Sequence, residues 1–217
     1  MTSERRRDHE DDGVPKASTT PVELLAVKFT ATAMVAFGIY GFATGARSTV
    51  SYLLSVVAVA LLIVRFRRVP IPGPLAVGLA LSATLHLAGG LIRVGDDVLY
   101  NASIGGRVAA LHTHVLQYDH FAHAFAVFVG TLTLWTLLVP HASSGASRND
   151  DVVLCLLAGI GIGGVNETIE FLTTTAHRGA HVGGYTNTGW DLVANIVGAL
   201  SAAAVVRRLQ RDAATAA

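Results

Sequence analysis

Six long apolar segments, separated by short polar stretches, run through most of the chain. Most of them approach the roughly 20 residues that an α-helix needs to cross a lipid bilayer. The segments are residues 24–43, 50–65, 73–92, 118–139, 152–172 and 190–206. This pattern predicts an all-α, polytopic membrane protein, folded as a bundle of six transmembrane helices of which the second is the shortest.

Composition agrees with a membrane protein and excludes other classes. The 217 residues are 52% hydrophobic and only 14% charged, and soluble proteins carry about twice that charged fraction. A net charge of +1 argues against a nucleic acid partner, so the expected partner is the lipid bilayer. The single cysteine, Cys155, lies in an apolar run, which excludes intramolecular disulfides and thiolate metal sites.

Charge placement predicts the orientation and the domain limits. Residues 1–21 mix acidic, basic, Pro, Ser and Thr residues and cannot form a core. We expect a disordered cytoplasmic tail there, a transmembrane domain over 22–208 and a short cytoplasmic tail over 209–217. Arginine clusters precede the first segment and follow the second and the sixth. The positive-inside rule then puts both termini in the cytoplasm.

Small residues at helix-packing spacing predict close contacts between helices. Gly159 and Gly163 form such a pair in the fifth segment, and Gly41 and Gly45 form one at the end of the first. The sixth segment offers Gly198 between two alanines. Such positions let two backbones approach each other in a membrane, so we expect the fifth and sixth segments to touch. The alternative is that these glycines are merely tolerated there.

Nine polar side chains interrupt the last four apolar segments. They are His86, Asp119, His120, His123, Asn166, Glu167, Glu170, Asp191 and Asn195. Depth along each helix, at 1.5 Å per residue, puts all nine in one layer near the outer end of the bundle. Within each helix the spacing of three or four residues puts neighbours on a common face. If the topology is inverted, the nine side chains still share one layer, on the other side of the membrane.

Four carboxylates in a poorly solvated layer need compensating charge. Like charges raise one another's pKa unless a proton, an imidazolium or a metal ion is present. Arg93, Arg107 and Arg178 lie in outer loops from which they can reach the layer. The least costly compensations are protonated carboxyl groups, protonated histidines or a bound divalent metal ion. The ligands of such an ion would be Asp119, His123, Glu170 and Asp191, and this donor set suits Zn, Mn or Mg.

Structural interpretations remain open beside this one. Ionisable groups near a helix end can reach water at little cost, and Asp119 also favours a helix N-terminus by charge–dipole attraction. His177 and His181 are four residues apart, but the glycines around them favour a loop and only a weak metal site.

The spacing of these residues resembles a known family pattern. Asp119-x-x-x-His123, Glu167-x-x-Glu170 and Trp190-Asp191-x-x-x-Asn195 resemble the YjdF-like family of uncharacterised bacterial inner-membrane proteins and, more distantly, the VanZ-like family. The likeness covers segments four to six. Glu170 stands where VanZ-like proteins tend to have Gln, which favours the YjdF-like group. The resemblance implies a location in the bacterial plasma membrane and supports the polar set without assigning it a reaction.

Three functions are compatible with this pattern. The leading hypothesis is an outward-facing site that acts on a lipid-linked or envelope ligand by hydrolysis or group transfer. In it Glu167 or Glu170 is the base, and His120 or His123 is the acid. The alternatives are a proton- or ion-coupled permeation protein, in which these groups relay protons, and a noncatalytic scaffold, in which they hydrogen-bond between helices. Nothing in the sequence indicates the oligomeric state.

Overall fold

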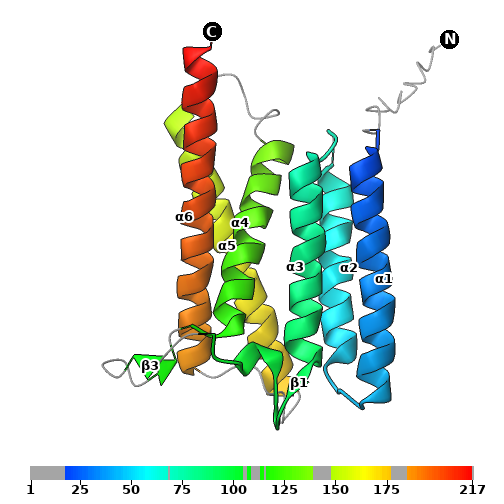
Figure 1. Ribbon diagram of the computed structural model, residues 1–217. Helices are drawn as coiled ribbons and strands as arrows, with labels where there is room; N and C mark the ends of the chain where they lie inside the picture. Colours follow the sequence, from blue (N-terminus) through cyan, green and yellow to red (C-terminus); the bar gives the residue numbers. More distant parts are fainter. Residues whose placement is uncertain are drawn as a thin grey trace, which may run out of the picture.

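The computed structural model describes residues 18–67, 69–104, 107–108, 113–114, 116–138, 148–176 and 185–216. Six long helices dominate this part of the chain (Figure 1), and each corresponds to one predicted segment. They are α1 (Pro21–Ala43), α2 (Thr49–Phe66), α3 (Gly73–Leu91), α4 (Tyr118–Leu138), α5 (Arg148–Ala176) and α6 (Tyr185–Thr215).

The helices have the length and the surface of membrane spans. Five of them, α1, α3, α4, α5 and α6, are long and apolar enough to cross a bilayer. Helix α2 is apolar but shorter, about 27 Å at 1.5 Å per residue. Large apolar side chains lie exposed on the outside of the bundle, for example Ile39 at 67% and Val64 at 70%. A helical membrane bundle is therefore confirmed, whereas the count of six spans stays a prediction.

Two groups of three helices make up the bundle. Helices α1, α2 and α3 contact one another, as do α4, α5 and α6, and the contact between α3 and α4 joins the groups. Helix α1 begins and α6 ends at the same end of the bundle, while α4 and α6 begin at the opposite end (Figure 1). The predicted polar layer therefore lies at the end away from the arginines that close α2 and α6.

Glycine packing brings α4, α5 and α6 together closely. A Cβ added at Gly163 would lie 2.7 Å from Asn195 Cβ, and one at Gly159 would lie 3.1 Å from Ala199 Cβ. One added at Gly198 would collide with the backbone carbonyl oxygen of Ala124 in α4. The predicted contact between the fifth and sixth segments is confirmed.

The predicted pairing of Gly41 with Gly45 is wrong. Gly41 packs against Thr49 of α2, whereas Gly45 lies beyond the end of α1 with nothing near its Cβ position. Its φ of 69° belongs to the left-handed region that favours glycine. Gly45 therefore serves the turn into α2 rather than helix packing.

Between α3 and α4 the chain forms two small antiparallel hairpins and one helical turn. Strands β1 (Arg93–Val94) and β2 (Asp97–Val98) pair, and so do β3 (Arg107–Val108) and β4 (Thr113–His114). The turn η1 (Leu99–Asn101) follows β2 and contacts α3 and α4. It places Tyr100, which is only 1% exposed, inside the bundle.

At the other end, Glu23 ties α1 to the connection between α2 and α3. Its carboxylate accepts hydrogen bonds from the backbone N–H of Ile71 at 2.7 Å and of Thr20 at 2.6 Å, and it pairs with Arg67 at 3.2 Å. Most of the predicted N-terminal tail lies outside the described residues. Helix α6 continues to Thr215, past the predicted domain limit at residue 208, and that division of the chain stays a prediction.

Candidate functional site

His123 lies at the centre of the predicted polar layer, with a carboxylate near each ring nitrogen. Its Nδ1 lies 3.1 Å from Glu167 Oε1. Its Nε2 lies 3.1 Å from Asp119 Oδ1 and 3.5 Å from Glu170 Oε1. Asp119 and His123 share one face of α4, because they are four residues apart, while Glu167 and Glu170 come from α5. One buried imidazole therefore gathers carboxylates from two helices.

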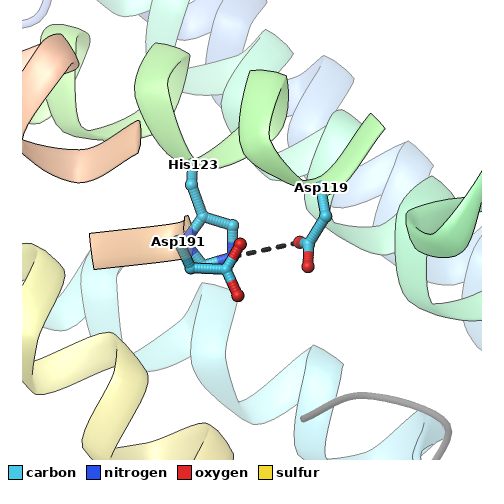
Figure 2. A group of neighbouring side chains, drawn as sticks. All are labelled: Asp119, His123 and Asp191. Atoms are coloured by element: carbon cyan, nitrogen blue, oxygen red, sulfur yellow. Dashed lines mark ion pairs between the residues drawn. The ribbon is translucent and has the colours of Figure 1, made fainter. Parts of the chain in front are cut away.

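Helix α6 supplies the fourth carboxylate, that of Asp191, which is 0% exposed. Figure 2 shows the Asp119 carboxylate directed toward the His123 ring, with the Asp191 carboxylate close to both. One ligand atom from each of these three residues lies within 4.8 Å of the others. Asn187, in the first turn of α6, donates from Nδ2 to both Asp191 Oδ2 and Asp119 Oδ2, the latter at 3.2 Å. This amide links α4 to α6 across the site.

Two further amides hold the glutamates of α5. Asn195 Nδ2 donates to Glu167 Oε1 at 3.0 Å, and both of these side chains are buried. Asn166 Nδ2 donates to Glu170 Oε1 at 2.9 Å. The Glu170 side chain keeps 16% exposure, compared with 5% for Glu167. Glu170 is therefore the more accessible of the two glutamates.

His120 lies at the edge of the cluster, near the start of α4. Its Nδ1 accepts a hydrogen bond from the backbone N–H of Gln117 at 3.3 Å. In the neutral ring that bond assigns the proton to Nε2. Nε2 faces Asp191 Oδ1 at 3.8 Å, and the ring centre lies 6.2 Å from that of Trp190.

His86 does not join the carboxylates. Its Nδ1 lies 2.7 Å from the hydroxyl of Tyr100, and its ring meets that of Tyr52 edge to face, with centres 5.0 Å apart. Burial raises the pKa of the Tyr100 phenol well above its usual value, so the hydroxyl stays protonated, and the tautomer of His86 decides which of the two donates. The Tyr100 ring lies 6.5 Å from that of His123. His86 is therefore linked to the site through Tyr100.

The predicted convergence of α4, α5 and α6 side chains in one layer is observed. Sequence reasoning missed Asn187, although its spacing of four from Asp191 continues the series that Asn195 extends. It also missed Tyr100, which comes from a loop and leaves no helical spacing to detect. The suggestion that Arg93 caps the site is wrong, because this side chain is exposed and donates to Asp96 O at 3.0 Å.

Other sequence-based suggestions are not tested here. His177, His181 and Arg178 lie outside the described residues, and the same holds for the side chain of Arg107.

Compensating charge is the main electrostatic question of this site. Within the described residues, no ion pair joins an arginine or a lysine to any of the four carboxylates. In that part of the chain, the basic side chains that pair with them are those of His120 and His123, which carry a positive charge only when protonated. Two sets of side chains have the composition and spacing to hold a metal ion: Asp119, His123 and Asp191, and Glu167, Glu170 and Asp191.

A family model described as "Predicted membrane protein (DUF2238)" matches residues 25–212. The chain belongs to this family. The match runs from α1 into α6 and therefore includes every residue of the polar layer. It agrees with the membrane bundle, while membership of the YjdF-like or VanZ-like families stays a prediction. No curated protein and no solved structure matches the chain.

Proposed function

We propose that this DUF2238 protein is a bacterial plasma-membrane protein whose site in the outer half of the bilayer acts on a lipid-linked or envelope ligand by hydrolysis or group transfer. The observation that carries the proposal is the convergence of four carboxylates, from three helices, on the buried ring of His123. Intramembrane ionisable groups are costly, and where they occur they generally serve a function.

The depth of the site suits a ligand with a lipid anchor. Asp119 belongs to the first turn of α4, and Asp191 lies about 9 Å along α6 from Tyr185. Both therefore lie near one end of the bundle, where lipid headgroups meet the acyl chains. The arginines that close α2 and α6 lie at the other end, and the positive-inside rule makes that end cytoplasmic. With six spans, both termini are then cytoplasmic and the site faces outward.

The side chains divide naturally into acid and base. Glu170 is the better base, because its side chain keeps 16% exposure, compared with 5% for Glu167, and a ligand can reach it more easily. Glu170 removes the proton from an attacking water or hydroxyl, whose oxygen then forms the new bond to the ligand. His120 is the better acid, in its protonated imidazolium form, because both ring nitrogens of His123 already face carboxylates. It gives a proton to the leaving group as the old bond breaks.

Proton or ion permeation has less support. A permeation path needs polar groups toward the cytoplasmic end as well. Among the described residues, Leu132, Ala202 and Val206 form a buried hydrophobic cluster between α4 and α6 beyond the site. Thr131 is buried nearby, but its hydroxyl donates to Val127 O of its own helix. The polar layer thus stops within one half of the bundle.

Comparative lipid analysis of cells tests the proposal. Membranes from cells expressing the wild type, Glu170→Gln or Asp151→Asn at equal amounts are compared by mass spectrometry of lipid-linked species. Asp151→Asn is the matched control, since it neutralises a carboxylate at the opposite end of the same helix. We expect the amount of at least one lipid-linked species to be the same in cells with the wild type and with the control. In cells with Glu170→Gln, we expect the amount of that species to differ from this value.

Two results would contradict the proposal. One is an identical lipid profile for all three proteins. The other is a proton flux in liposomes that the wild type shows and Glu170→Gln lacks, which would favour permeation instead.

A further inference from the structure

The two ring nitrogens of His123 have different surroundings. Nδ1 faces Glu167 Oε1, which Asn195 holds through a hydrogen bond of 3.0 Å. Nε2 faces the opposite side, toward Asp119 and Glu170. Histidines that bind metals almost always donate one ring N–H to a carboxylate, carbonyl or water and ligate with the other nitrogen. The chain from Asn195 through Glu167 orients His123 in this way.

The spacing on the Nε2 side matches the spacing of ligand atoms around a small divalent ion. Two atoms each about 2.1 Å from a tetrahedral metal ion are about 3.4 Å apart. Nε2 lies 3.1 Å from Asp119 Oδ1, and all three ligand atoms of Asp119, His123 and Asp191 lie within 4.8 Å of one another. Small side-chain movements would therefore complete the coordination.

Asp191 provides an independent indication of a ligand. Its side chain is 0% exposed, and its Oδ1 has no hydrogen-bond partner among the described residues, since His120 Nε2, at 3.8 Å, is beyond hydrogen-bond distance. An unsatisfied carboxylate oxygen in a buried site is costly, and a bound ion removes that cost. The carboxylate lies close to the His123 ring and the Asp119 carboxylate, with one ligand atom of each residue within 4.8 Å of the others (Figure 2). This oxygen distinguishes the site from an acidic cluster whose members satisfy one another.

We propose that Asp119, His123 and Asp191 bind one divalent transition-metal ion. The use of the ion in a reaction rests on the proposed function, whereas its binding does not. Mixed carboxylate and imidazole ligands suit Zn²⁺ and Mn²⁺ better than Mg²⁺, which prefers oxygen ligands and keeps several waters. The ion also offsets two of the four carboxylate charges.

Glu170 is not one of the three proposed metal ligands. The sequence alone suggests it as a fourth ligand, but it is more exposed than the other three residues and lies 3.5 Å from His123 Nε2. Catalytic zinc sites usually have three protein ligands and one open position for water. Glu170, whose Oε1 lies 3.5 Å from His123 Nε2, would then serve as the base for a water that the bound ion activates.

Metal analysis of the detergent-purified full chain tests the proposal. We expect about one equivalent of a divalent transition metal in the wild type and in the control Asp151→Asn. Asp119→Asn and Asp191→Asn lose the metal, and Glu170→Gln keeps it. Glu167→Gln keeps the metal with an affinity 10- to 100-fold lower, the usual effect of removing an outer partner of a ligand. Elution volume and helical circular dichroism check that each variant is folded.

Titration of the wild type makes the test independent of the variants. Chelator-treated protein is titrated with Zn²⁺ and Mn²⁺ while its unfolding temperature is followed, and we expect it to rise with the metal. The proposal is wrong if purified wild type holds no stoichiometric metal and neither ion stabilises it. It is also wrong if folded Asp119→Asn and Asp191→Asn retain the metal. If the protein binds the metal but the lipids do not change, the metal site is supported and the proposed function is rejected. If the lipids change but the protein binds no metal, the proposed function is supported and the metal site is rejected.

Discussion

Asn195 donates one hydrogen bond, from Nδ2 to Glu167 Oε1, and does so where both side chains are buried. Its neighbour Gly163 leaves room for it, because a Cβ at that position would lie 2.7 Å from Asn195 Cβ. A small residue on α5 and an amide on α6 thus act together. They fix the glutamate that orients His123.

Replacing Asn195 by alanine leaves a buried carboxylate oxygen without its amide donor. Such a loss costs about 1–3 kcal/mol, so the free energy of unfolding in detergent falls by that amount. Asn166→Ala is the matched control, because its bond to Glu170 is only partly buried, and a smaller loss is expected there. Equal losses in the two variants would show that burial of the Asn195 bond has no special importance.

At the scale of elements, the contact of α6 with α4 depends on Gly198. A Cβ added at Gly198 would collide with the backbone carbonyl oxygen of Ala124. A backbone carbonyl cannot rotate away as a side chain can. Gly198→Ala therefore forces the two helices apart and disturbs the site between them. Such overpacking typically costs about 1–3 kcal/mol, to be measured as a decrease in the free energy of unfolding.

Gly164→Ala is the control for this substitution. Gly164 is also helical, but nothing lies within 4 Å of its Cβ position. Alanine has the higher helix propensity, by about 1 kcal/mol, so this variant is as stable as the wild type or more stable. A Gly198→Ala protein that matches Gly164→Ala in stability would contradict the close packing of α4 and α6.

Helix positions were predictable from the sequence because the length of an apolar run in a membrane protein is set by the bilayer. The layer shared by Asp119, Glu167 and Asp191 was predictable for the same reason, since a fixed rise per residue converts sequence position into depth. The positions of side chains in the connections between helices were not predictable in this way. Tyr100 reaches His86 from η1, and no periodic pattern marks a loop residue that folds back into a bundle.

The start of α6 explains a second omission. The apolar run suggested a beginning at residue 190, whereas the helix begins at Tyr185 with polar residues. Asn187 therefore lies outside the predicted membrane segment, residues 190–206. A polar first turn is compatible with a membrane helix where it meets headgroups or binds a buried partner, and Asn187 binds two carboxylates.

At the scale of the whole molecule, the orientation in the membrane can be tested directly. Asp96 lies exposed in the turn after β1, and Arg211 lies exposed near the end of α6. Single cysteines at these positions, in a Cys155→Ala background, are treated in whole cells with a membrane-impermeant maleimide. We expect labelling of Asp96→Cys in intact cells and of Arg211→Cys only after permeabilisation. The opposite pattern would place the site on the cytoplasmic side.

We infer that the four carboxylates are kept together for a function and not for the stability of the fold. Asp191→Asn tests it most directly, because asparagine preserves the shape of the side chain and removes one charge from the cluster. The measurement is the unfolding temperature of Asp191→Asn and wild type, both in detergent with excess chelator. We predict that the variant unfolds at the same temperature or higher, because repulsion between like charges decreases. A decrease of several degrees would show instead that the cluster holds the helices together.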